Sequence, residues 1–236
     1  MCGRYVLSTW VDVLDLLGLD SADASWFEPR FNIAPTQSAP VFLQRDSAAP
    51  LLDERLRWGL IPHWAKERSF GARCINARGE TAHEKPSFRE AFARRRCIVP
   101  ATGFYEWQRE GRERLPYFVH RSDGEPMLFA GLWSSWSERT TDTMFESESV
   151  LETFTIVTRA AEGPLTRIHD RAPLILDPIL ARQWATLGHL DTAAAREVVA
   201  EAPTPELSLR PVAKAVNNVR HQGAELVIEC VGHGVR

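Results

Sequence analysis

The alternation of hydrophobic and polar positions predicts a chain built mostly from short β-strands separated by turns. Apolar residues at helical spacing run from Val11 to Leu19 and predict a short helix that ends at Gly18. The apolar run at 40–43, the alternating segment 54–60 and the proline-stopped run 97–100 predict strands. Further strands are predicted at 103–108, 116–120, 127–133, 154–158, 173–176 and 226–230.

A few segments break this strand pattern. Residues 84–96 predict an arginine-dense helix, and residues 179–187 and 192–201 predict two more helices. Residues 137–152 are polar and acidic, which predicts a solvated loop between two strands. The chain contains no internal repeat and no long linker, so the pattern predicts a single domain of the α+β class, mainly antiparallel β with peripheral helices.

Composition adds that the chain can bury a core, because 44% of its 236 residues are hydrophobic. The sequence contains neither an apolar run long enough to span a bilayer nor a secretion signal at its start, so we expect a soluble cytoplasmic protein with no membrane partner. The four cysteines form no CxxC pair, which favours free thiols in a reducing compartment and no metal. The net charge of −3 requires any nucleic-acid site to be a local cluster of arginines.

Cys2 is the first candidate for chemistry because of its position. Methionine is commonly removed when a small residue follows it, and loss of Met1 would leave a free α-amine beside a thiol. An α-amine has a pKa of about 7.7–8.0, so roughly a tenth of it is unprotonated at pH 7, against less than about 0.1% of a lysine. Such an aminothiol captures an aldehyde as an imine, which the thiol then closes intramolecularly into a thiazolidine ring. Position alone equally fits a small buried residue near the chain end.

Six segments give Cys2 a context. They occur in the order Met1-Cys2-Gly3-Arg4-Tyr5, Asn32-Ile33-Ala34-Pro35-Thr36, Trp58-Gly59-Leu60-Ile61-Pro62-His63-Trp64, Asn76-Ala77-Arg78-Gly79-Glu80-Thr81, Cys97-Ile98-Val99-Pro100-Ala101-Thr102-Gly103-Phe104-Tyr105-Glu106-Trp107, and Ile168-His169-Asp170-Arg171-Ala172-Pro173. Together they resemble the SRAP family, the SOS-response-associated peptidase proteins that sense abasic sites in single-stranded DNA. The resemblance extends from residue 2 to about residue 228, and it implies a barrel-like SRAP domain over 2–228 with a tail at 229–236.

The resemblance implies that Cys2 is the crosslinking residue and that Asn76, Glu106 and His169 complete the catalytic set. We expect Asn76 to orient the amine or the sugar oxygen, Glu106 to relay the amine proton, and His169 to protonate the sugar ring oxygen. Such groups are also required by the chemistry, because the closed abasic sugar must open and the imine must lose water with acid help. The resemblance further implies that Glu106 assists release of Met1, a peptidase reaction on the chain itself, and reversal of the crosslink. It leaves open an AP-lyase activity.

DNA contact requires cations for phosphates and flat surfaces for bases. The resemblance implies phosphate contacts for Arg4, Arg78 and Arg171, whereas Trp58, Trp64 and Phe70 are our candidates for stacking. We expect an abasic site in single-stranded DNA as the partner, no cofactor, a monomer, and association with the nucleoid after damage.

Ordinary structural roles remain open for these residues. Glu106 lies in an alternating strand, where a glutamate usually faces solvent, His169 fits a loop, and Asn76 fits a turn. The tryptophans fit a large core. The run Arg94-Arg95-Arg96 fits a solvated helix end, or an extension of a DNA groove.

Two positions depart from the family pattern. Ala172 stands where the family has methionine, and Glu162 stands where it has asparagine. We expect the first to change packing near His169, and the second to place an extra acid near the site, where it would weaken DNA contact or alter the pKa of His169.

Two other functions fit parts of the sequence. An N-terminal-nucleophile amidohydrolase or peptidase would use the Cys2 thiolate with its own amine as base. A noncovalent single-strand binding module would use arginines and aromatic rings, with Cys2 incidental.

Overall fold

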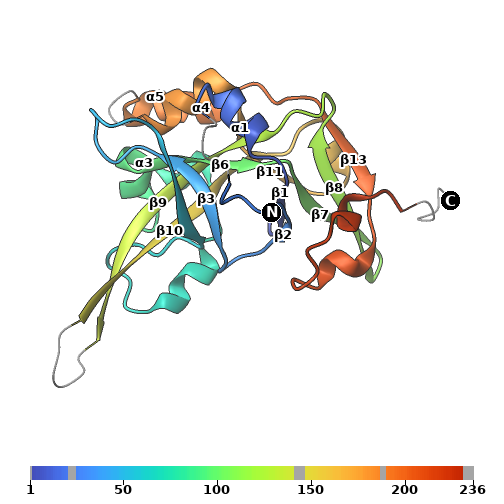
Figure 1. The fold of residues 1–236 in the computed structure, drawn as a ribbon, viewed down its shortest axis with the longest axis horizontal. Helices are drawn as coiled ribbons and strands as arrows, with labels where there is room; N and C mark the ends of the chain where they lie inside the picture. Colours follow the sequence, from blue (N-terminus) through green and yellow to red (C-terminus); the bar gives the residue numbers. More distant parts are fainter. Residues whose placement is uncertain (1, 21–24, 141–146, 187–189, 231–236) are drawn as a thin grey trace.

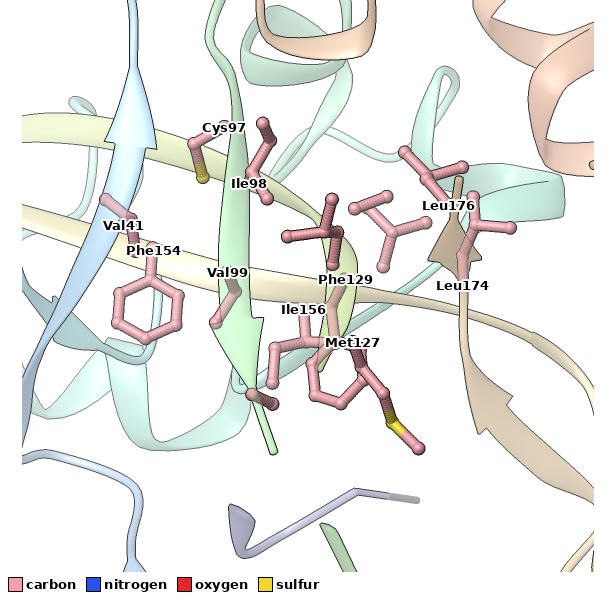
Figure 2. Packing of buried hydrophobic residues seen from close by; sticks show 14 of the residues in the cluster. Val41, Cys97, Ile98, Val99, Met127, Phe129, Phe154, Ile156, Leu174 and Leu176 are labelled. Atoms are coloured by element: carbon pink, nitrogen blue, oxygen red, sulfur yellow. The ribbon is translucent and has the colours of Figure 1, made fainter. Parts of the chain in front are cut away.

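The structure, a computed structural model, describes residues 2–20, 25–140, 147–186 and 190–230. Five strands pair in a closed ring, β3 (Ser38–Leu43), β4 (Leu52–Trp58), β6 (Arg96–Ala101), β9 (Met127–Thr140) and β10 (Ser147–Ala160). All neighbours in the ring are antiparallel except β4 and β10, which run parallel. The ring confirms the predicted α+β class with a barrel-like, mainly antiparallel core. Figure 2 shows part of the apolar cluster that fills this core, with Phe129, Phe154 and Ile156 among its members.

A second sheet carries the N-terminus. Its strand order is β13 (Leu207–Pro211), β8 (Glu113–Arg121), β7 (Gly103–Glu110), β1 (Tyr5–Leu7) and β2 (Arg30–Ile33). β1 lies antiparallel between β2 and β7, with Tyr5 opposite Phe104. The first residues of the chain therefore lie beside the strand that contains Glu106, in the middle of the molecule (Figure 1).

Short strands at the edge of the barrel bring two sequence motifs together. β5 (Asn76–Arg78) pairs parallel with β10, and β11 (Arg171–Pro173) pairs antiparallel with it. Thr158 of β10 is opposite Arg78 on one side and Pro173 on the other. The segments around Asn76 and His169 therefore flank the same strand. The last short strand, β12 (Ile175–Leu176), pairs with β9.

Helices lie around this framework. α1 (Val11–Leu17), α4 (Pro178–Ala185) and α5 (Thr192–Glu201) gather at one end of the molecule, where Figure 1 shows them side by side. α1 ends as predicted at Gly18, whose φ of 59° is the left-handed conformation that glycine adopts without strain. The remaining helical segments are α2 (Gly79–Ala82), α3 (Arg89–Arg94), and the 3-10 turns η1 (Arg68–Arg73), η2 (Gly163–Arg167), η3 (Lys214–Asn217) and η4 (Ala224–Val227).

The prediction of a loop over 137–152 was wrong for its described parts. Residues 137–140 and 147–152 continue β9 and β10 into a long hairpin, with Ser137 opposite Val150 and Trp136 opposite Leu151. Figure 1 shows this hairpin extending beyond the barrel. A hairpin that leaves the core has no buried face to impose alternation, so its polar sequence looked like a loop. Residues 141–146 lie outside the described part.

Two boundaries also differ. The helix predicted over 84–96 is confined to Arg89–Arg94, with turns before it. The strand predicted at 226–230 is instead the turn η4 followed by a single bridge between Val212 and Glu229. Within the described residues, no helix is long and apolar enough to cross a membrane.

Candidate functional site around Cys2

Cys2 lies immediately before β1 and is fully buried. Its thiol faces the Arg4 carbonyl oxygen at 3.7 Å, and the Tyr105 amide of β7 donates to that same oxygen at 2.9 Å. The side-chain amide of Asn76 donates to the Cys2 carbonyl oxygen at 2.8 Å. The other atom of this amide group, Asn76 Oδ1, is buried without a hydrogen-bond partner among the described residues. Asn76 therefore holds the first peptide of the chain and keeps an acceptor available beside it.

Glu106 is buried rather than solvent-facing, with 3% of its surface exposed. It lies on β7 opposite Tyr117, and its negative charge acts on the Cys2 thiol. Burial raises the pKa of the Cys2 thiol far above its ordinary value, and the charge of Glu106 raises this pKa further. The resting Cys2 is consequently a neutral thiol with an acidic residue beside it.

His169 follows η2 and is about one quarter exposed. Its Nδ1 accepts a hydrogen bond from the Arg171 amide at 2.9 Å and lies 2.8 Å from a carboxylate oxygen of Asp170. A neutral ring satisfies the first contact, whereas a protonated ring donates to the second. The loop thus offers partners to both protonation states, as an acid that gives up and regains a proton requires.

The three predicted phosphate-binding arginines have different surroundings. Arg4 Nη1 donates to Asn32 Oδ1 and to the Val216 carbonyl, both at 2.9 Å. Arg171 forms a two-pronged ion pair with Glu80, both distances being 2.7 Å, and also donates to the Thr158 carbonyl. These hydrogen bonds from Arg171 hold the pKa of Glu80 below its ordinary value. Arg78 is exposed. Arg171 is therefore largely engaged inside the protein.

Two grooves meet at Cys2. The first, about 370 Å³, is called the Trp107 groove and includes Gly3. The second, about 410 Å³, is called the Lys85 groove and includes Asn76, which bonds to Cys2. Neither lining contains an aspartate or glutamate, and together they contain five cationic side chains. The Trp107 groove is lined by Gly3, Arg4, Trp107, Arg114 and Asn217, and the Lys85 groove by Arg73, Cys74, Ile75, Asn76, Arg78, Thr81, Lys85, Pro86, Ser87 and Phe88.

Sequence reasoning missed several of these residues. Trp107 directly follows Glu106, and Arg73 and Lys85 lie close to the motif around Asn76, so proximity to the predicted catalytic residues was an available signal. Arg114 and Asn217 had no such signal, because β8 and the C-terminal residues reach the groove only through tertiary structure.

Of the three predicted stacking residues, Trp58 is contradicted. Its ring is fully buried in the core, parallel to Phe154 at 6.3 Å, and its Nε1 donates to the Ile75 carbonyl. A buried ring offers no face to a base. Trp64 is 47% exposed and packs edge-on against the partly buried Phe70, with ring centres 5.2 Å apart. Trp64 and Phe70 keep accessible surface for such a role.

The arginine run at the end of α3 is not uniformly solvated. Arg96 is buried and donates to four backbone carbonyls, those of Trp184, Phe92, Ala93 and Leu190. This part of the run holds the barrel to α4 and cannot extend a DNA groove.

The two departures from the family pattern are accommodated locally. Glu162 is exposed, pairs with Arg159 and accepts from Thr204 at 2.8 Å; the Thr204 bond, followed by the charge of Arg159, lowers the pKa of Glu162. Its charge is thus shared with partners outside the Cys2 site. Ala172 is buried in β11 opposite Arg159.

Comparison with known proteins places this arrangement among relatives. The chain is 36% identical to the abasic site processing protein YedK of Escherichia coli, over 96% of this chain and 99% of that protein. It is 32% identical to the abasic site processing protein YoqW of Bacillus subtilis, with the same coverage. A solved Bacteroides thetaiotaomicron protein shares the fold with a TM-score of 0.81, at 24% identity and with 98% of this chain and all of that chain covered. Residues 1–219 match the family described as SOS response associated peptidase (SRAP). The chain belongs to this SRAP family.

Proposed function

We propose that this protein processes abasic sites in single-stranded DNA by forming a covalent crosslink through Cys2 after Met1 is removed. The observation that carries the proposal is the placement of the first peptide. Asn76 holds the Cys2 carbonyl, Glu106 lies beside the thiol, and two acid-free cationic grooves meet there. The names of the relatives YedK and YoqW agree with this substrate.

The reaction begins at the α-amine. The amine adds to the aldehyde of the opened sugar, and loss of water gives an imine. The S–H bond of Cys2 then adds across the C=N bond, with sulfur joining carbon and the proton going to nitrogen. The product is a thiazolidine, and the sequence needs neither oxidant nor reductant.

The surrounding residues divide the proton transfers. Asn76 Oδ1 is an acceptor for the free amine, and Glu106 takes a proton from the amine or the thiol. His169 protonates the ring oxygen of the sugar as it opens. By the same acid-base chemistry Glu106 assists release of Met1, as a peptidase acting on its own chain, and reversal of the crosslink; an AP-lyase activity would start from the same imine.

The resting state of the thiol favours this order of steps. A thiolate nucleophile of the amidohydrolase or peptidase type requires a lowered thiol pKa, whereas burial raises the pKa of Cys2. An amine that attacks first does not need the thiolate. The buried thiol is needed only after the imine has formed, when it is held next to the carbon that it must reach.

The DNA strand would follow the two grooves. Arg4 and Arg114 on one side, and Arg73, Arg78 and Lys85 on the other, provide the local positive charge that the net charge of −3 does not. Trp64 and Trp107 provide ring faces for bases. The protein would act as a monomer in the cytoplasm and associate with the nucleoid after damage.

The test uses Met1-processed protein, verified by intact mass, and an oligonucleotide with one abasic site. Wild type should give a heat-stable adduct on a denaturing gel, and Cys2→Ala should give none. Cys2→Ser keeps the amine, so it should give an adduct only after borohydride reduction of the imine. Cys230→Ser, which alters another cysteine, should behave as wild type. Equal heat-stable adduct from Cys2→Ser would exclude the thiazolidine, and release of ammonia from glutamine without any adduct would favour the amidohydrolase.

A further inference from the structure

Asn32 in β2 is fully buried and connects the N-terminal site to the end of the chain. Its Oδ1 accepts from Arg4 Nη1 at 2.9 Å. Its Nδ2 lies 3.1 Å from the carbonyl oxygens of Val216, Asn218 and His221 and donates to them. A buried amide is costly unless its donors and acceptors are satisfied, and here one side chain uses all of them on functional and C-terminal backbone.

The residues that Asn32 holds belong to a segment without long regular structure. We call residues 212–230 the C-terminal segment; it includes η3 and η4 and lies beside β2 and β8 in Figure 1. Gln222 adds a second attachment, since it exchanges hydrogen bonds with the Asn32 backbone N–H and carbonyl at 3.2 and 3.0 Å. The attachment of this segment therefore converges on one position of β2.

Two consecutive residues of η3 in turn hold the two principal side chains of the Trp107 groove. The Val216 carbonyl accepts from Arg4 Nη1 at 2.9 Å, and Asn217 Oδ1 accepts from Trp107 Nε1 at 2.8 Å. Each contact fixes one edge of a planar group. The remaining N–H groups of Arg4 and the faces of the Trp107 ring are left to a ligand.

We propose that Asn32 is a positioning residue for DNA. It docks η3 against the N-terminal strand, and η3 fixes Arg4 for a phosphate and Trp107 for a neighbouring base. The inference rests on the proposed function, because it assigns one wall of the same DNA groove. The C-terminal segment is by this account part of the binding site, although no side chain between Lys214 and Val227 takes part in the chemistry.

The first test uses exposed positions whose substitution leaves the core intact. Asn217→Ala and Trp107→Phe remove the two ends of one hydrogen bond while a flat ring remains. Each should weaken binding of abasic single-stranded DNA about threefold, a typical effect of one neutral hydrogen bond. The double variant should be no weaker than either single variant. Additive losses, or no loss in either variant, would overturn the role of η3 at Trp107.

The second test measures the salt dependence of binding. One lost phosphate contact on a single strand lowers the slope of log K against log salt by about 0.7. Arg4→Ala and Asn32→Ala should each lower it by that amount, and the double variant by no more. Gln222→Ala, which leaves the Asn32 side-chain contacts in place, should keep the wild-type slope. A wild-type slope in Asn32→Ala would overturn the inference; if Asn32→Ala fails to fold, the exposed pair decides.

The two proposals fail differently. If wild type forms no heat-stable adduct, the proposed function is wrong whatever Asn32 does. If wild type forms the adduct and Arg4→Ala changes the slope, the phosphate contact stands, and an unchanged slope in Asn32→Ala then refutes only the positioning role. A small aldehyde that carries no phosphate should react equally with wild type and Asn32→Ala, because the change affects DNA and not the aminothiol.

Discussion

The two grooves that meet at Cys2 have similar volumes, yet their cations are held differently. In the Trp107 groove Arg4 is fixed by Asn32 and by the Val216 carbonyl. In the Lys85 groove Arg78 and Lys85 are exposed on short helical and turn segments. A fixed cation loses little conformational entropy on binding, whereas a mobile one must be ordered by its ligand. The comparison suggests that one wall defines the register of the strand and the other tolerates variation.

The largest expected effect lies at the junction of the grooves. Glu106→Gln keeps the shape of the buried side chain but removes its proton-accepting carboxylate. We expect the single-turnover rate of adduct formation to fall about 100-fold or more, the usual contribution of a general acid-base group. Equilibrium binding of uncleaved abasic DNA should stay within about twofold of wild type. A variant that binds normally and reacts at the wild-type rate would remove Glu106 from the chemistry.

The comparison itself is tested by replacing one arginine on each wall. Arg4→Ala should weaken binding about tenfold, since hydrogen bonds to charged groups contribute about 1.5–3 kcal/mol when both partners are well placed. Arg78→Ala should weaken it only a fewfold, because exposed charges contribute about 1 kcal/mol or less. Fluorescence anisotropy at constant salt measures both. Equal losses would show that prior fixing of Arg4 has no consequence.

Trp64 and Trp58 sharpen the distinction between ligand contact and core. Trp64→Ala should cost about 1–3 kcal/mol of DNA binding if one base stacks on the ring. Its effect on thermal unfolding should be small, since the side chain is 47% exposed. Trp58→Phe should show the opposite pattern, lowering the melting temperature while DNA affinity of the folded protein is unchanged. Equal melting temperatures for Trp58→Phe and wild type would contradict the buried, hydrogen-bonded placement.

The smallest effect concerns the pair between Glu80 and Arg171, beside the Lys85 groove. Hydrogen bonds from Arg171 lower the folded-state pKa of Glu80. A lowered pKa contributes stability that is present above the unfolded pKa and is lost as pH falls through the folded pKa. Glu80→Gln should therefore cost about 0.5 kcal/mol at neutral pH after solvent screening, and less in acid. Urea unfolding at neutral and acidic pH measures this, and a cost that grows on acidification would contradict the sign.

Much of the strand framework was predictable because buried strands leave an alternating or continuous apolar pattern. β3, β4 and β6 were located in this way, as was the end of α1 at Gly18. The β9 and β10 hairpin was missed because strands that pair mainly with each other need no apolar face. Closure of the ring through the parallel pairing of β4 with β10 joins residues about 100 positions apart, which local patterns do not encode.

The candidate site was predictable as a set of residues but not as surroundings. The motifs identified Cys2, Asn76 and Glu106, and the structure joins the first two by a hydrogen bond and places the charge of the third on the thiol. Burial of Trp58 and Arg96 could not be inferred, because the same residue types serve cores and DNA grooves alike. The attachment of η3 to Asn32 spans 184 positions and depends on backbone carbonyls, which every sequence has.

The burial of the Cys2 thiol also bears on the survival of the protein in an oxidising or alkylating environment. Peroxides and soft electrophiles react with exposed thiolates, and Cys2 is neither exposed nor ionised at neutral pH. Cys230, which is partly exposed, should be consumed first. A residue that can react only once must remain intact until its substrate arrives, and desolvation gives Cys2 that durability without any protecting partner protein.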